Sequence, residues 1–129
     1  MPDAPEEILE LWIERVNRLE VESVVKLYDK GSTMLPTFSP HCLSQPRQIK
    51  EYFQQLSTRQ SMKVDVHAET LNRMELGDGK YILTGIYSFH FVVDNADLTF
   101  PSRFTLIIDT SREAPILHHH SSQIPRTLS

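Results

Sequence analysis

The feature that most constrains the fold is a change in the spacing of apolar residues after Ser61. From Met62 to Ala68, apolar side chains occupy every second position, with charged residues and a histidine between them. This period of two is typical of a half-buried β-strand with one solvated face. Turn residues, among them Asp78-Gly79, then separate further long apolar segments. The expected antiparallel strands cover residues 62–68, 80–93, 98–109 and the segment after residue 113.

Before this change, apolar residues recur at the spacing of amphipathic helices. The three expected helices cover residues 4–19, 21–28 and 45–56, with Ser44 as the cap of the third. Gly31 is expected to end the second helix, and Pro36 interrupts a short extended segment at 33–38. Helices followed by a β-meander predict an α+β fold. The length predicts one domain spanning residues 1–129.

The strand over 80–93 has two possible inner faces. One face is Leu83, Gly85, Tyr87, Phe89 and Phe91, and the other is Thr84, Ile86, Ser88, His90 and Val92. We expect the aromatic set to be the concave face, with Gly85 allowing the strand to bend. The sequence therefore predicts a cone-shaped, curved antiparallel sheet wrapped around three N-terminal helices, with a cavity at its open end.

Composition excludes several classes of function. The net charge is -4, with 13 Lys and Arg against 17 Asp and Glu, so no nucleic-acid partner is expected. No apolar run is long enough to span a membrane, and the acidic N-terminus does not follow the pattern of a signal peptide. Cys42 is the single cysteine, so no internal disulfide can form. These features favour a cytoplasmic protein.

The segment 116–125, ILHHHSSQIP, carries the densest group of side chains suited to chemistry. Because successive side chains of a strand point to opposite faces, one face is expected to carry Ile116, His118, His120 and Ser122. His119 and Ser121 would then leave that face and lie at a subunit interface. The first face is expected to form one side of a polar pocket.

Three motifs carry a resemblance to a known family. They are Leu35-Pro36-Thr37, Ser102-Arg103-Phe104-Thr105-Leu106, and His118-His119-His120-Ser121-Ser122 with Pro125. With the order of elements, they resemble the branch of the nuclear-transport-factor-2-like (cystatin-like) superfamily that contains the association domain of calcium/calmodulin-dependent protein kinase II. Within that branch, the chain looks most like the iota-class carbonic anhydrases.

The resemblance implies reversible hydration of CO2 to bicarbonate in a pocket at the mouth of the cone. The implied catalytic residues, which bind water and bicarbonate, are Thr37, Tyr52, His120 and Ser122. Members of the class are described both as metal-free enzymes and as manganese- or zinc-dependent ones. The implied partners are therefore CO2 and bicarbonate, and the resemblance leaves the metal open.

A metal is the usual means of making water nucleophilic. His118 and His120 could supply two ligands, but catalytic zinc typically has three protein ligands. The third would have to be His90 or His41, and no nearby carboxylate stands out. We therefore expect no metal cofactor, with manganese or zinc as the alternative.

Without a metal, hydrogen bonds would hold the water. The hydroxyls of Thr37, Tyr52 and Ser122 could position it against CO2. His120, with an ordinary pKa near ~6.5, would accept the proton. The expected substrate-binding residues are Tyr87, Phe89, Arg103 and His118. Thr37 also has a purely structural interpretation in a turn, and Tyr52 has one in core packing.

Two other functions fit the same pattern. The first is a non-catalytic domain for oligomerisation or small-anion binding, as in the kinase association domain. The second is an isomerase or cyclase, which usually needs a buried carboxylate or histidine base. An exposed apolar strand face would favour a homodimer or a higher homo-oligomer through the sheet, with Thr105 and Ile107 as candidate contacts.

Overall fold

The computed structural model describes residues 3–125 as an α+β fold, which confirms the predicted class. The elements are α1 (Pro5–Asn17), α2 (Val21–Val25), β1 (Tyr28–Leu35), α3 (Pro46–Leu56), β2 (Gln60–Val66), a 3-10 turn (Ala68–Thr70), β3 (Asn72–Gly77), β4 (Lys80–Val93), β5 (Ala96–Asp109) and β6 (Ile116–Gln123). None of the helices in this range is both long and apolar enough to cross a membrane.

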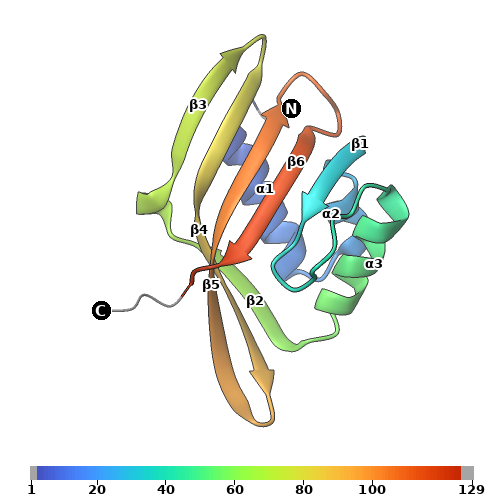
Figure 1. Cartoon of the computed structure of the whole chain (residues 1–129), viewed down its shortest axis with the longest axis vertical. Coiled ribbons are helices and arrows are strands. Elements are labelled where there is room, and N and C mark those ends of the chain that lie inside the picture. Colours follow the sequence, from blue (N-terminus) through green and yellow to red (C-terminus); the bar gives the residue numbers. More distant parts are fainter. Residues whose placement is uncertain (1–2, 126–129) are drawn as a thin grey trace.

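The strands form one curved sheet in the order β1-β6-β5-β4-β2, and β3 pairs with the other half of β4. Figure 1 shows the helices on one side of this sheet, with α1 behind β4, β5 and β6. The opposite side of these strands, which we call the outer face, is covered by no helix (Figure 1). The helices and the concave side of the sheet therefore enclose the core between them.

Two strands depart from the expected meander. The predicted second helix is wrong beyond Val25, because β1 begins at Tyr28 and runs through Gly31. β1 pairs with β6 in parallel, from Tyr28 opposite Ile116 to Leu35 opposite His120. This long-range pairing, which buries Tyr28, overrides the local helical pattern. β3 was not expected, and all six of its residues are exposed.

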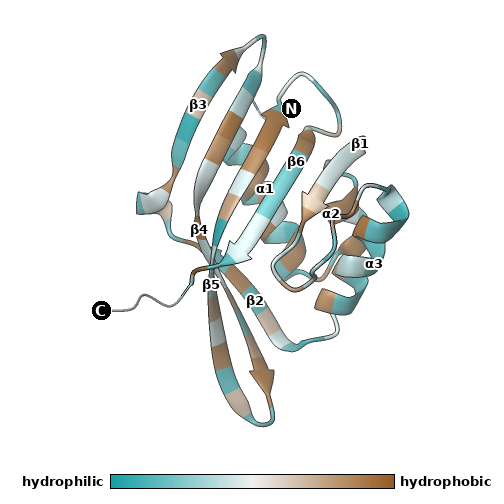
Figure 2. Cartoon of the chain, in the orientation of Figure 1, coloured by the Kyte–Doolittle hydropathy of each residue, from teal (hydrophilic) through white to brown (hydrophobic). Residues whose placement is uncertain are grey.

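The aromatic face of β4 points into the core, as predicted. Tyr87 and Phe89 are 1% and 2% exposed, and the ring of Trp12 from α1 stacks on Tyr87 at 5.3 Å. Gly85 has a packing reason, because a Cβ atom there would lie 2.8 Å from a methyl group of Leu71 and 3.1 Å from the ring of Phe104. Figure 2 shows the apolar residues alternating along these strands.

The outer face is defined by rows of residues paired across the strands. One row runs Met74, Ile82, Ile107, His118 and Thr33, and the next runs Asn72, Thr84, Thr105, His120 and Leu35. Met74 is 59% exposed and Leu35 is 37% exposed, while the isoleucines are half-buried. This face therefore combines apolar side chains with histidine and threonine and has no covering element within residues 3–125.

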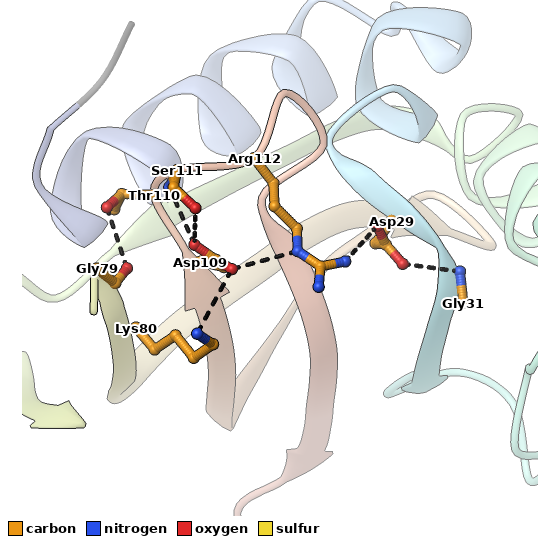
Figure 3. Close-up of polar contacts among 8 residues, drawn as sticks. All are labelled: Asp29, Gly31, Gly79, Lys80, Asp109, Thr110, Ser111 and Arg112. Atoms are coloured by element: carbon orange, nitrogen blue, oxygen red, sulfur yellow. Dashed lines mark hydrogen bonds and ion pairs between the residues drawn. The ribbon is translucent and has the colours of Figure 1, made fainter. Parts of the chain in front are cut away.

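A buried carboxylate joins the end of β5 to the start of β1 (Figure 3). Asp109 accepts hydrogen bonds from the backbone N–H of Ser111 at 3.0 Å and from the Arg112 guanidinium at 3.2 Å. Arg112 also pairs with Asp29 at 3.1 Å, and Asp29 accepts from the N–H of Gly31. These contacts lower the pKa of Asp109. The hydrogen bonds from Ser111 have the largest effect, and the cations Lys80 and Arg112 add to it.

Candidate functional site

The strand β6 presents the opposite face to the one expected. His119 is 0% exposed and Ser121 is 4% exposed, and both point into the core. His118, His120 and Ser122 lie on the outer face instead. The prediction that these three line the inner pocket is therefore wrong, as is the placement of His119 and Ser121 at a subunit interface.

The cause is a shift in register near the start of β6. Ile108 pairs with Ile116, but Ile107 pairs with His118, so Leu117 is an extra residue in β6. Such a bulge changes which side chains face inward. Ile116 and His119 are consequently both buried although they are three residues apart. Strict alternation from Ile116 places every later side chain on the wrong face.

The buried imidazole of His119 lies between two tyrosines. The Tyr28 hydroxyl is 2.7 Å from Nδ1, and the Tyr87 hydroxyl is 3.0 Å from Nε2. The indole N–H of Trp12 donates to the Tyr28 oxygen at 3.0 Å. Because indole can only donate, the Tyr28 hydroxyl hydrogen is free to donate to Nδ1. This assigns the His119 hydrogen to Nε2, from which it donates to Tyr87.

The hydrogen bonds continue from Tyr87 through three hydroxyl side chains. The hydroxyl of Ser121 acts on Tyr87, where it opposes the rise in the tyrosine pKa, and Ser121 is in short contact with Thr37. The Thr37 hydroxyl donates to Ser102 at 3.4 Å, and Ser102 donates to the carbonyl of Phe100 at 3.4 Å. We call the seven side chains Trp12, Tyr28, His119, Tyr87, Ser121, Thr37 and Ser102 the polar chain. All its bonds can run in one direction, from the indole to this carbonyl.

The polar chain is neutral near pH 7. Burial, followed by the neighbouring His118 and His120, lowers the pKa of His119 to about 3. Burial likewise raises the pKa of Tyr28 and that of Tyr87 well above 10, so both stay protonated. His119 can therefore relay hydrogen bonds, but it is a poor proton acceptor at neutral pH.

A cleft of about 420 Å³ lies beside the polar chain, between α3 and the loop after β1. Its lining residues are Phe38, Ser39, Pro40, His41, Leu43, Gln48, Glu51, Tyr52, Gln55, Leu56 and Arg59. Thr37 belongs to the polar chain and Phe38 to the cleft, so adjacent residues join the two. The ring of Phe38 packs against those of Phe89 and Phe100 at 5.2 and 5.3 Å.

The structure therefore distributes the predicted site residues over three places. Thr37 and Tyr87 belong to the polar chain, Phe89 lies beside it in the aromatic core, and Tyr52 faces the cleft. Those on the outer face are Arg103, His118, His120 and Ser122. Catalytic roles for Thr37 and Tyr52 stay predictions.

Apart from Trp12, which was expected only on the buried side of the first helix, sequence reasoning missed Tyr28, Ser102, His119 and Ser121 as members of the polar chain. Tyr28 was placed at a helix end, and the two residues of β6 were assigned to the wrong face. Ser102 alternates with Phe104 and Leu106 on β5, which was a signal for a polar residue on a core face. The other three depend on the register of β6, which has no local signal.

The polar chain does not fit a metal ion. Both nitrogens of His119 are used in hydrogen bonds to tyrosines, and the remaining members offer hydroxyls and an indole. Within residues 3–125, no three His, Cys, Asp or Glu side chains are grouped as metal ligands. The predicted alternative of His118 and His120 joined by His90 or His41 is therefore not assembled in one chain.

Comparison with known proteins places the chain in a family. Residues 6–125 match the calcium/calmodulin dependent protein kinase II association domain, and the chain belongs to this family. Comparison with curated proteins finds no match.

Two solved structures share the fold. A protein from Xanthomonas campestris described as an association domain of this kind superposes with a TM-score of 0.81 at 24% identity, covering 92% of this chain and 84% of that one. The second is the epoxide hydrolase/cyclase-like enzyme SalBIII, described as having a role in pyran ring formation in the polyether salinomycin. It superposes with a TM-score of 0.73 at 13% identity, covering 92% of this chain and 89% of that one. At these identities, both likenesses show the fold alone.

Proposed function

We propose that this chain is an oligomerisation domain that associates with copies of itself through the outer face of its sheet. Membership of the association-domain family supports assembly. The observation that carries the proposal is the uncovered row of Met74, Ile82 and Ile107 across β3, β4 and β5. Apolar side chains gathered on a face that no helix covers are typical of an interaction surface.

A stable dimer needs a minimum area of contact on this face. A standard interface buries about 800 Å² on each partner. That is roughly a tenth of the 7717 Å² surface of this chain. The outer face spans several strands, and on it Ile107 lies directly beside His118 of β6, with Thr105 and His120 in the next row.

Sedimentation velocity on wild-type protein and the Ile107→Glu variant tests the proposal. A buried, unpaired carboxylate at the centre of the interface should convert dimers or larger oligomers to monomers. Leu19→Glu is the matched control, because Leu19 is 49% exposed and lies in the turn between α1 and α2, outside the rows of the outer face. A wild-type chain that is monomeric at micromolar concentration would contradict the proposal.

A second candidate is hydration of CO2 in the cleft beside the polar chain. It is supported by the contact between the hydroxyls of Thr37 and Ser121, because Thr37 directly precedes Phe38, which lines the cleft together with Tyr52. These groups could hold a water by hydrogen bonds in the way that the family resemblance implies. The polar chain contains no carboxylate, and burial lowers the pKa of its histidine, His119, to about 3, so the polar chain offers no effective base for the isomerase or cyclase alternative.

Two adjacent serines give this candidate a sharp test. Stopped-flow CO2 hydration should fall at least about tenfold in Ser121→Ala, because its hydroxyl bonds to Thr37 inside the fold. Ser122→Ala should retain full activity, because Ser122 lies on the outer face. The assay is run on chelator-treated protein, with and without added zinc or manganese. A wild-type chain that is inactive in every condition would exclude this candidate.

A further inference from the structure

We infer that His118 and His120 form half of a zinc-type metal site on the outer face, and that the same pair from a second copy completes it. This inference rests on the proposed function, because it needs two outer faces to meet. The feature behind it is the His-x-His segment of β6, in which two imidazoles project from one face of a strand.

The backbone places both side chains on one side of the sheet. His118 lies opposite Ile107 and Thr33, and His120 lies opposite Thr105 and Leu35. Two residues along a strand separate Cα atoms by about 7 Å. Parallel side chains of this length at that spacing can lean together and bind one ion through one nitrogen each.

The ring of His118 is oriented for this role. Its Nδ1 is 2.7 Å from the hydroxyl of Thr33 on the neighbouring strand. When Nδ1–H donates to this hydroxyl, Nε2 keeps its lone pair. Metal-binding histidines almost always have their second nitrogen held by such a partner. Thr33 is therefore a positioning residue for the proposed ligand.

His120 is available in a different way. It is exposed on the outer face, and its imidazole forms no hydrogen bond to other side chains of residues 3–125. The charged residue Arg103 pairs with Ser122, two positions further along β6, so it does not lie between the two histidines. The pair thus consists of one held imidazole and one free imidazole.

Coordination chemistry explains why a second copy is required. Structural zinc takes four ligands in a tetrahedron, and imidazole is among its preferred ligands. One chain supplies two, and its residues 3–125 bring no group of three or more potential ligands together. A two-fold axis between outer faces would add the partner's identical pair, giving four nitrogens. This arrangement places the ion at the centre of the proposed interface.

Zinc titration of the chelator-treated full chain tests the inference, with isothermal calorimetry for binding and sedimentation velocity for assembly. We expect one zinc per two chains and a tighter dimer in zinc. His118→Ala and His120→Ala should each abolish both effects, while His41→Ala, a change at an exposed loop histidine, should leave them intact. Thr33→Val should weaken zinc binding about 10- to 100-fold without changing the fold by circular dichroism.

The outcomes separate this inference from the proposed function. Dimers that depend on Ile107 but neither bind zinc nor respond to it would overturn the metal site alone. Binding of one zinc per chain, or binding that survives both histidine variants, would also overturn it. Assembly that requires zinc but is indifferent to Ile107→Glu would support the metal site and contradict the apolar interface. A chain that stays monomeric with and without zinc would overturn both.

Discussion

Tyr28 and His119 lie 91 residues apart in the chain, yet the tyrosine hydroxyl is 2.7 Å from the imidazole Nδ1 inside the core. The contact joins β1 to β6, the one parallel pair of strands in residues 3–125. It also sets the protonation of the ring, because Tyr28 accepts from Trp12 and must donate onward. Several measurable properties depend on this arrangement.

Replacement of Tyr28 by Phe should destabilise the protein by about 1–3 kcal/mol, because two buried polar groups then lose their partner. The Trp12 indole would have no acceptor, and His119 Nδ1 would have no donor. Urea unfolding monitored by tryptophan fluorescence measures the change. Tyr81→Phe is the control, since Tyr81 is half-buried and outside the polar chain, and it should cost under about 0.5 kcal/mol. Equal effects of the two variants would contradict the role given to Tyr28.

Stability should fall as the pH drops from about 6.5 toward 4. The pKa of His119 is about 3 in the folded chain and near 6.5 in the unfolded chain, so the unfolded state binds more protons in this range. The contribution of neutral His119 to the free energy of unfolding is complete above the pKa of the unfolded state. Below that pKa it decreases by up to about 1.4 kcal/mol per pH unit. Urea unfolding between pH 4.5 and 7 measures the slope.

A variant isolates His119 from other titrating groups. His119→Asn should flatten the slope between pH 4.5 and 6.5, whatever its cost in absolute stability. His118 is the necessary comparison, because burial also lowers its pKa. His118→Asn should remove only a smaller part of the slope. An unchanged slope in His119→Asn would show that the buried imidazole does not control acid stability.

Asp109→Ala should destabilise the end of the sheet by about 1–3 kcal/mol, because the N–H and hydroxyl of Ser111 lose their acceptor. The variant should also reduce the loss of stability below about pH 4, since the folded-state pKa of this carboxyl is lowered and its contribution disappears on protonation. Thermal unfolding at pH 7 and pH 3.5 checks both effects. Arg47→Gln, which breaks an exposed pair on α3, is the control and should have little effect.

Gly85→Ala should cost about 1–3 kcal/mol despite adding a single methyl group. The new Cβ would lie 2.8 Å from Leu71 and 3.1 Å from the Phe104 ring, and one of them would have to move. Gly31→Ala in β1 is the matched control, because its nearest contact is a flexible Asp29 carboxylate at 3.3 Å. Thermal unfolding of both variants should show a loss of stability in Gly85→Ala and none in Gly31→Ala.

Periodicity was sufficient for much of the fold and for little of the site. The alternation in β2 and β4 predicted both strands, and it correctly predicted that the side chains of Tyr87 and Phe89 face the core. The helical spacing around Trp12 likewise predicted α1 and its buried side. In contrast, the start of β1 was predicted as a helix end and only residues 33–35 as extended, because the stability of β1 comes from pairing with β6 rather than from its own residues.

By itself, the sequence determined the class of fold, the family and the kinds of side chain available for chemistry. These properties depend on local spacing and on motifs, both of which can be read along one chain. Only the tertiary structure decided which histidine is buried. One extra residue at Leu117 shifts the register against β5, turning His119 to the tyrosines and His118 and His120 to the outer face. A register depends on how two strands pair side by side in the sheet, so the alternation along one strand does not reveal it.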